Sequence, residues 1–588
     1  MRMTKGMQVT RRDALKIGLA AAAMGAAGCA SSETEDTDAG TDTDAGSSST
    51  EAAEEAGAAT VVGELELDCV HEMAGAELED LQAWIETTVY DEDAQEDIMY
   101  ELESAKSGQT LEEPLVEYDP FGTNTQSLYV YFNTSAEASV SYTVSVSDDE
   151  AASITDESFT AGTIDDYTAS VDDGELATEH EFQVKGLIPG VANTVTITAT
   201  YEDGTAEACT LTCTMGGLVG SEELQLEVTE GESEEELEPG LYVVLGNDSD
   251  EADFMFYYDN QGILRSEVPV IGYRSHRMLF DEQGTMYYSA SQSRMAAMNK
   301  LGQITDVYYL GDFDLHHDYV WRTTRQMLIL ATDTSRDDSD EDLVITLDID
   351  TGEVEQVIDM GDLLPAYKET AFAYHEENYE PEEGEEDDVA GWMHINSIQY
   401  LEDEDAVLLS SRETSSIFKI SGLSDTPTLD YILASELFWA DTEYADLVFA
   451  QEGDFTVHGG QHCLIYVEDD TLEDGQYYLQ FYNNNYGKSA STTNDFDYEG
   501  AGIGVGDDPS SYYYEYLVDE NARTFELVDS LAVPYSGFVS SVQWKGSNLI
   551  VDSGAQGLFT EYDADYNAIR TFSMGADKFI YRVFKYDL

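Results

Sequence analysis

The stretch His276-Arg-Met-Leu-Phe-Asp-Glu-Gln-Gly-Thr-Met-Tyr-Tyr288 runs from a short apolar segment through an acidic, glycine-containing turn into a second apolar segment. This is the pattern of two β-strands joined by a turn. Segments of the same form begin near His317, His394, His462 and Ser541, and another opens at Gly240-Leu-Tyr-Val-Val244. Such self-similarity predicts a repeat architecture built from small sheets.

The final apolar stretch, Lys578-Phe-Ile-Tyr-Arg-Val-Phe-Lys-Tyr586, is expected to complete the unit that opens at Gly240. Counting that closure as one blade predicts a six-bladed β-propeller over residues 239–588. The intervals between repeats are uneven, which indicates one insertion before His394 and another around residues 492–511. A closed ring leaves no exposed sheet edge, whereas a long open sandwich would have to protect its edges. We therefore prefer the propeller.

The region before the repeats divides into smaller parts. Residues 111–216 contain alternating segments such as Ser127–Phe132 and Thr194–Tyr201, which predict an N-terminal β-sandwich domain similar to fibronectin type III modules. Residues 61–110 are expected to be partly helical, because apolar side chains recur there at three- and four-residue steps. The acidic residues 221–238 are expected to form a linker. The fold class is therefore all-β, with a short helical segment ahead of the sandwich.

The N-terminus carries the pattern of an export signal. Thr10–Lys16 has the form of a twin-arginine motif, an apolar run follows, and Ala26-Ala27-Gly28-Cys29 is similar to a lipoprotein cleavage box, although Ala26 stands where Leu is usual. We expect residues 1–29 to be a signal peptide and Cys29 to be lipidated. Residues 30–60 are acidic and low in complexity, which is typical of a disordered linker. The protein is thus expected outside the cytoplasm, lipid-anchored to the outer face of the cytoplasmic membrane.

The charge of the chain limits its partners. A formal net charge of −97 would repel nucleic acids and anionic membranes, so contact with a membrane is expected only through the lipid anchor. A site for an anion on such a protein must concentrate the few cationic side chains. Cysteines are sparse, and Cys209 and Cys213 lie on one side of a single strand, about 13 Å apart. Pairing of Cys69 with either of them stays open.

Histidines occupy equivalent places in three consecutive repeats: His316-His317-Asp318, Trp392-Met-His394-Ile-Asn396 and Gly460-Gln-His462-Cys463. The first strand of a blade lines the central channel of a propeller, so these side chains should converge at one mouth. Ser410-Ser411-Arg412 lies in the next strand after His394 and should reach the same place. The chain has only 9 His, so such a register is not expected by chance.

These motifs, in this order, resemble those of the bacterial arylsulfate sulfotransferases, over about residues 111–588. The resemblance implies that His462 is a catalytic nucleophile that becomes sulfated. It also implies that His394, Arg412 and His317 are catalytic and hold the sulfuryl oxygens, with His316 and Asn396 as further substrate-binding residues. His317 rather than His316 is favoured because His317 and His462 both take the second place of their motifs. The family usually has Asp after the nucleophilic His, where Cys463 stands here, so another group must orient the imidazole.

The expected function is the transfer of a sulfuryl group from a phenolic sulfate ester to another phenol by a ping-pong mechanism through a sulfo-histidine. A planar guanidinium suits two sulfuryl oxygens, and imidazoles can donate and accept protons. A covalent intermediate divides one transfer into two steps. The sequence has no phosphate-cradling glycine loop, so we expect no phosphoadenosine phosphosulfate. We also expect no other cofactor and no metal.

Two alternatives stay open at this point. His317, His394 and His462 could form a three-His metal site of a hydrolase or oxidoreductase, although no carboxylate ligand is evident and Arg412 would repel a cation. The chain could also be a non-catalytic propeller lipoprotein that binds a ligand. A sulfatase that uses water as acceptor is a nearer variant. The natural donor and acceptor, and whether the protein is a homodimer, are not specified by the sequence.

Overall fold

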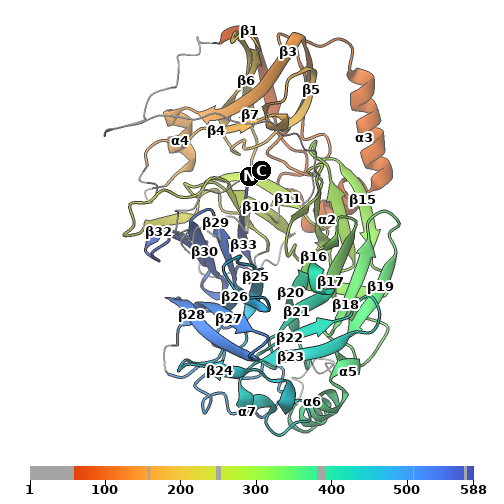
Figure 1. The fold of residues 1–588 in the computed structure, drawn as a ribbon. Helices are drawn as coiled ribbons and strands as arrows, with labels where there is room; N and C mark the ends of the chain where they lie inside the picture. The colour runs from red at the N-terminus through yellow and green to blue at the C-terminus, as the bar shows by residue number, and fades with distance from the viewer. Residues whose placement is uncertain are drawn as a thin grey trace, which may run out of the picture.

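The computed structural model describes residues 59–588, except 157, 158, 160, 221, 247–252, 380–390, 507, 508 and 575–578. The twin-arginine motif and Cys29 lie outside the described residues. Figure 1 shows the N-terminal β domain (orange) beside one rim of a ring of sheets (green to blue). The C-terminus lies where the two parts meet, and Tyr167 of the N-terminal domain donates a hydrogen bond from its hydroxyl to the carbonyl of Leu588 (2.9 Å).

Six sheets form the ring, which confirms the prediction of a six-bladed propeller. The first four blades have four strands each. The first blade consists of β9 (Leu241–Val244), β10 (Phe254–Tyr258), β11 (Leu264–Pro269) and β33 (Val583–Tyr586), and the second of β12 (Leu279–Phe280), β13 (Met286–Ser291), β14 (Arg294–Met298) and β15 (Ile304–Tyr309). The third blade consists of β16 (Phe313–Thr323), β17 (Gln326–Asp333), β18 (Leu343–Asp348) and β19 (Val354–Asp359). The fourth consists of β20 (Ile395–Leu401), β21 (Ala406–Ser411), β22 (Ser416–Ser421) and β23 (Thr428–Leu433).

The last two blades have five strands each. They consist of β24 (Ala450–Glu452), β25 (His462–Val467), β26 (Gln476–Asn483), β27 (Ser511–Asp519) and β28 (Thr524–Val533); and β29 (Ser541–Lys545), β30 (Asn548–Ser553), β31 (Leu558–Tyr562), β32 (Ala568–Ser573) and β8 (Glu227–Glu230). Central strands of the blades are mostly apolar and buried, as in β17 and β18, because both faces of each blade pack against a neighbouring blade.

The ring closes at both ends of the chain. The last strand, β33, pairs antiparallel with β9, as the sequence predicted, with Val583 opposite Val244. The first strand of the ring, β8, pairs with β32 at the outer edge of the sixth blade, with Arg570 opposite Glu230. The acidic stretch 221–238, expected as a linker, therefore contributes a strand. Its side chains are mostly exposed, and charges are tolerated on such an edge.

The N-terminal domain is one seven-stranded assembly of β1 (Thr60–Cys69), β2 (Leu115–Tyr118), β3 (Leu128–Val146), β4 (Tyr167–Ser170), β5 (Ala177–Val184), β6 (Ala192–Tyr201) and β7 (Ala206–Met215). Strand β1 falls within the segment expected to be partly helical, and it pairs parallel with β7. Cys69 and Cys213 bring their thiols into hydrogen-bond contact across this pair. All four cysteines in the described part of the chain are free.

Helices are few and short. The helical periodicity before the sandwich corresponds to α2 (Leu78–Trp84), a π-helical turn at Ile85–Val89, and α3 (Glu92–Ala105), capped by Asp91. Helix α3 spans the two domains, since Glu92 Oε1 accepts a hydrogen bond from the amide of Val307 in β15 (2.7 Å). The other helices are α4 (Asp148–Ile154), α5 (Met360–Leu363), α6 (Pro365–Asn378) and α7 (Glu436–Trp439). Helices α5 and α6 belong to the insertion before His394.

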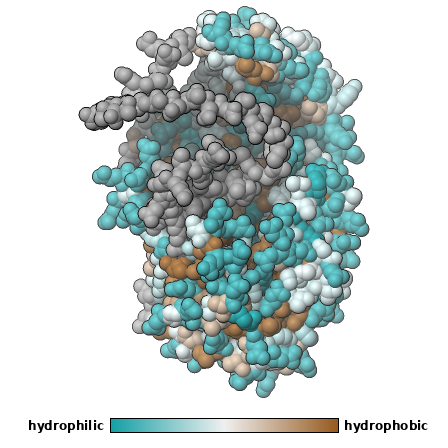
Figure 2. Space-filling view, in the orientation of Figure 1, coloured by the Kyte–Doolittle hydropathy of each residue, from teal (hydrophilic) through white to brown (hydrophobic). Residues whose placement is uncertain are grey.

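Hydrophilic residues cover most of the described surface that faces the viewer in Figure 2, in keeping with 122 Asp and Glu in the chain. Within the described residues, every helix is too short or too polar to cross a membrane.

Candidate active site

The candidate site lies where the innermost strands of three neighbouring blades begin. His316 and His317 lie in β16, His394 directly precedes β20, and His462 is the first residue of β25. The rings of His317 and His394 contact each other, with centroids 4.5 Å apart, and His316 lies against His317. All four histidines are largely buried. The structure thus brings the predicted histidines to one end of the channel.

The backbone bends at the same place in each of these strands. His317, His394 and Cys463 have positive φ angles of 54°, 47° and 57°, which cost free energy for residues other than glycine. Each bend coincides with a register shift in the pairing to the next strand, and such bulges re-aim side chains. By this bend, Cys463 corresponds to His317, so His462 corresponds to His316. Place in the sequence motif pairs His462 with His317, whereas the backbone bend pairs His462 with His316.

His462 is oriented by two oxygen acceptors. Its Nδ1 lies 2.8 Å from Oδ1 of Asn484 and 3.0 Å from the carbonyl of Gly460. The amide of Asn484 donates to the carbonyls of Ser536 and Val539, which fixes the oxygen toward His462. Nδ1 must therefore carry the hydrogen, and Nε2 keeps its lone pair. Asn484 supplies the orienting group that Cys463 cannot.

Several effects keep His462 uncharged. Burial lowers its pKa to about 3; the hydrogen bond that Nδ1 donates to Asn484 opposes this, and the charges of Arg412 and His394 lower the pKa further. Cys463 itself points its thiol to the carbonyl of Val542 and packs in the core. The imidazole is therefore a neutral, oriented nitrogen base over the ordinary pH range.

Arg412 is tied to both the histidine and an acid. Its amide donates to the carbonyl of His394 (3.1 Å), which places the two residues side by side across the β20–β21 hairpin. Its Nε and Nη2 donate to Oε1 of Glu413, at 3.2 and 3.0 Å. The other carboxylate oxygen of Glu413 accepts hydrogen bonds from the insertion after β26, including the amide of Ser491 (3.3 Å). The guanidinium fork is thus turned toward Glu413.

Asn396 contacts the backbone that precedes His462. Its Nδ2 donates to the carbonyl of Gln461 (2.8 Å), and its own carbonyl accepts from Nη2 of Arg582 (3.1 Å). Among the described residues its Oδ1 has no hydrogen-bond partner. The sequence predicted that Asn396 binds substrate; that stays a prediction, and the structure adds a contact from Asn396 to the backbone beside His462.

Asp318 of the His-His-Asp motif forms ion pairs with two arginines from other blades. Its carboxylate pairs with Nε of Arg277 (3.0 Å) and Nη1 of Arg582 (2.9 Å). Burial opposes its charge, but the two arginines hold the pKa of Asp318 below its usual value. Arg582 directly precedes the closing strand β33, so the last strand connects the inner strands of three blades.

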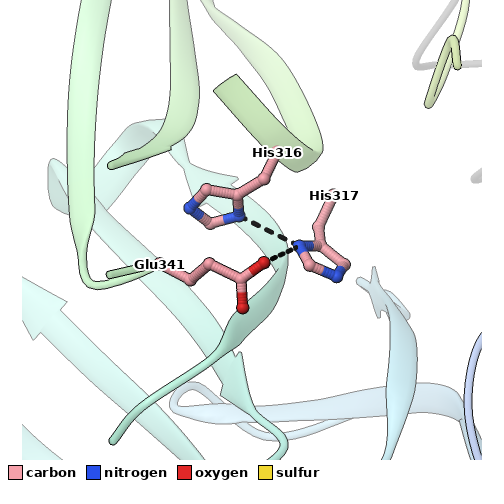
Figure 3. A group of neighbouring side chains, drawn as sticks. All are labelled: His316, His317 and Glu341. Atoms are coloured by element: carbon pink, nitrogen blue, oxygen red, sulfur yellow. Dashed lines mark hydrogen bonds and ion pairs between the residues drawn. The ribbon is translucent and has the colours of Figure 1, made fainter. Parts of the chain in front are cut away.

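Glu341 is the main site residue that sequence reasoning missed. It lies between β17 and β18, and its carboxylate reaches between two histidines: it pairs with Nδ1 of His394, and its Oε1 lies 3.5 Å from Nδ1 of His317. Figure 3 shows this carboxylate beside His317, whose Nδ1 is in turn 3.0 Å from that of His316. The interpretation that no carboxylate is at hand is therefore wrong. One acid among so many carries no sequence signal.

The residues able to hold a metal differ from those expected. Within the described chain, the donor atoms close enough to share an ion belong to His316, His317 and Glu341, within 4.8 Å of one another. His462 is not among them, so the three-His arrangement of His317, His394 and His462 is not the cluster that the structure forms.

A second arginine, Arg274, stands at the mouth among aromatic rings. Its guanidinium carbon is 4.2 Å from the ring centroid of Tyr581 and 4.6 Å from that of Tyr273. Burial lowers the pKa of His317, and the charges of His394, His316 and Arg274 lower it further. An anionic group with an aromatic ring would meet both positive charge and aromatic faces here. A cation so rare in this acidic chain was a signal that sequence reasoning passed over.

Two family models match the chain. The model for arylsulfotransferase (ASST) matches residues 227–582, and the model for the arylsulfotransferase Ig-like domain matches residues 115–216. No curated protein matches the chain.

Solved structures share only a general likeness with the chain. A putative 6-phosphogluconolactonase from Bacteroides fragilis is 9% identical, with a TM-score of 0.32 over 59% of this chain and 98% of its own. A putative 6-phosphogluconolactonase from Bacteroides uniformis is 11% identical, with a TM-score of 0.31 over 66% of this chain and 92% of its own. A chain of the nidogen/laminin complex is 8% identical, with a TM-score of 0.34 over 59% of this chain and 97% of its own.

Proposed function

The chain belongs to the arylsulfotransferase family, and from that premise we propose that it carries a sulfuryl group from a phenolic sulfate ester to another phenol by way of a covalent sulfo-His462. One observation carries the proposal: the two acceptors on Nδ1 of His462 leave Nε2 with an oriented lone pair, on a ring whose pKa the charges of Arg412 and His394 lower. A neutral imidazole in that state is a nucleophile.

In the first half-reaction, Nε2 of His462 attacks sulfur and the bond from sulfur to the phenolic oxygen breaks. The departing phenolate takes a proton from a neighbouring imidazole, for which His394 and His317 are in place. The sulfated ring keeps its hydrogen on Nδ1 and becomes an imidazolium. The oxygens of Asn484 and Gly460 accept a hydrogen bond from Nδ1 and stabilise the positive charge of the ring. Arg412 and Arg274 supply the positive charge that an anionic sulfate ester requires.

In the second half-reaction, an acceptor phenol gives its proton to the same imidazole and attacks sulfur. The bond from nitrogen to sulfur breaks, and neutral His462 is restored. The donor is a phenolic sulfate itself, so the proposal includes independence from phosphoadenosine phosphosulfate. The aromatic rings of Tyr273 and Tyr581 beside Arg274 offer surfaces for the phenyl group.

The mechanism is tested by steady-state kinetics and by trapping. Initial rates with varied donor and acceptor should give parallel reciprocal lines. Incubation with 4-nitrophenyl sulfate alone, then peptide mass analysis under alkaline conditions, should find one added sulfuryl group on the peptide containing His462. Intersecting lines together with an unmodified peptide would exclude the covalent route.

We also propose that the chain is exported by the twin-arginine route and anchored through a lipid on Cys29. The support is the paired Arg11 and Arg12 and the cleavage box before Cys29. Intact-mass analysis of detergent-extracted protein should show a diacylglyceryl cysteine at the mature N-terminus. A mature chain beginning elsewhere without lipid would contradict the anchor.

A further inference from the structure

Glu341 is held against His394 by backbone as well as by its side chain. Its amide donates to Oγ1 of Thr332 (2.8 Å), and its carbonyl accepts from the amide of Ile395 (2.9 Å), the residue after His394. The next residue, Asp342, accepts from the indole of Trp392 (3.0 Å). The segment 341–342 of the third blade is therefore docked along residues 392–395 of the fourth blade. This placement is part of the fold and does not depend on a flexible side chain.

The carboxylate of Glu341 engages one nitrogen of His394 and leaves the other for chemistry. It pairs with Nδ1, while Nε2 of His394 is buried without a hydrogen-bond partner among the described residues. About a fifth of the Glu341 side chain (19%) and 14% of the His394 side chain are exposed. A buried, unpartnered ring nitrogen is costly in a finished structure unless a ligand completes it.

We infer that Glu341 is the positioning residue that allows His394 to act as the acid in the first half-reaction and as the base in the second. The inference rests on the proposed function and names the residues that handle the proton of that reaction. A carboxylate on Nδ1 fixes the tautomer and orientation of an imidazole and stabilises its protonated form, as in the Ser-His-Asp triad.

The proton balance follows from one proton shared by the pair. When the pair holds it, Nε2 carries a hydrogen, whether the shared proton lies on the carboxyl oxygen or on Nδ1. Nε2 gives that hydrogen to the departing phenolate as the bond to sulfur breaks, and the pair is left as a carboxylate facing Nδ1–H. Nε2 then has a lone pair and accepts the proton of the acceptor phenol as that oxygen attacks sulfur. The pair returns to its starting state.

The surroundings set the pH range of the pair. Burial raises the pKa of Glu341, and His316, Arg412 and Arg274 oppose this shift. Burial lowers the pKa of His394, and Arg412 and Arg274 lower it further, against the charge of Glu413. His317 faces the same carboxylate through Oε1. Both shifts favour an uncharged acid bonded to an uncharged imidazole, which is the form that presents a hydrogen on Nε2.

A metal ion on His316, His317 and Glu341 is the competing use of the same carboxylate. The proton relay is favoured because the nearest partner of Glu341 is His394, which lies outside that group. The charges of Arg412 and Arg274 also act on Glu341, and they oppose entry of a divalent cation.

The experiment compares two donors in Glu341→Gln. Nitrophenolate leaves as a stable anion near neutral pH, whereas phenolate needs a proton. In single turnovers without an acceptor, release of phenol from phenyl sulfate should slow by about 10²-fold, and release of nitrophenol from 4-nitrophenyl sulfate by less than about 5-fold. Glu341→Asp keeps the acid and should keep the ratio between donors near that of the wild type. Glu355→Gln, an exposed acid on β19 of the same blade, should leave both rates unchanged.

Equal losses with both donors in the single-turnover rates of Glu341→Gln would overturn the proton role and leave a structural one. A stoichiometric metal in the purified wild type that is lost in Glu341→Gln would overturn it in favour of the metal site. Sulfo-His462 formed by Glu341→Gln from 4-nitrophenyl sulfate would keep the proposed function whatever the donor ratio shows. Absence of sulfo-His462 from the wild type would refute the proposed function itself.

Discussion

His462 and His394 lie at matching ends of adjacent blades, and they differ in the group that holds Nδ1. His462 is held by neutral oxygens of Asn484 and Gly460, whereas His394 is held by the carboxylate of Glu341. A neutral acceptor fixes the tautomer without attracting a proton to the ring. A carboxylate fixes it and also stores a proton. In the mechanism that we propose, this difference suits the imidazole for attack in one blade and for proton transfer in the next.

The most severe test of this difference removes the nucleophile. His462→Ala should reduce transfer and nitrophenol release to background, a loss on the order of 10⁴-fold or more, because His462 is the ring among His316, His317, His394 and His462 whose Nδ1 is held by neutral oxygens. Far-ultraviolet circular dichroism and the melting temperature should stay close to those of the wild type. Retained turnover in a folded variant would remove His462 from the centre of the mechanism.

Removal of the other histidine should cost less. His394→Ala should lower turnover of phenyl sulfate by about 10²-fold, since proton transfer is lost while attack by His462 remains. The reciprocal plots should stay parallel. A loss as complete as that of His462→Ala with 4-nitrophenyl sulfate as donor would show that the two histidines do not divide the work.

Arg412 is proposed to bind the sulfuryl group in both half-reactions, so its substitution should slow both of them alike. Arg412→Lys keeps the charge and loses the planar fork, and it should slow turnover at least about 10-fold, equivalent to about 1.4 kcal/mol of barrier. Glu413 must release part of that fork when a sulfate ester binds, because it now holds Nε and Nη2. Unchanged rates would show that the fork stays with Glu413.

The smallest expected effect comes from giving Nδ1 of His462 a carboxylate partner, as Nδ1 of His394 already has. The pKa of His462 is about 3, so its neutral form persists well below pH 6 in the wild type. Asn484→Asp places a carboxylate on Nδ1, which should raise this pKa by about 1–2 units or more. Protonation then removes the lone pair, so activity should fall as pH drops through the raised pKa. The rate near pH 8 should change only a few-fold.

The control for this variant is Asn485→Asp, the next residue in the chain. The pH profile of nitrophenol release from 4-nitrophenyl sulfate is the readout. If its acid limb is the same in Asn484→Asp as in the wild type, Asn484 does not set the protonation state of His462.

Much of the fold was readable from the sequence, because each blade repeats one alternation of apolar strands and acidic turns. The closing pair β9–β33 was predicted for the same reason. Strands β1 and β8 were not predicted. They carry many charged side chains, and their pairing depends on the backbone of the neighbouring sheet, which the sequence pattern does not indicate. The inner-strand histidines and Arg412 were proposed as site residues because these types are rare in the chain.

The partners of these residues were harder to find. Glu341 is one acid among 122, and its role depends on a loop that docks from a neighbouring blade. Asn484 offered a weak signal, since it is the middle residue of the run Asn483-Asn484-Asn485 that follows the strand paired with β25. Sequence patterns locate residues on elements, but a contact between blades depends on how the ring closes.

The closing strand gives this site an order of assembly. Tyr581 donates to the carbonyl of His317, and Arg582 bonds Asp318 and the carbonyl of Asn396, just ahead of β33. These residues follow their partners in the chain by 186 to 264 residues, so the contacts form only after the segment between them has been made. A chain that lacked Tyr581 and Arg582 would leave the carbonyl of His317 and the carboxylate of Asp318 without these partners, so we expect it to assemble the site poorly even if the other blades fold.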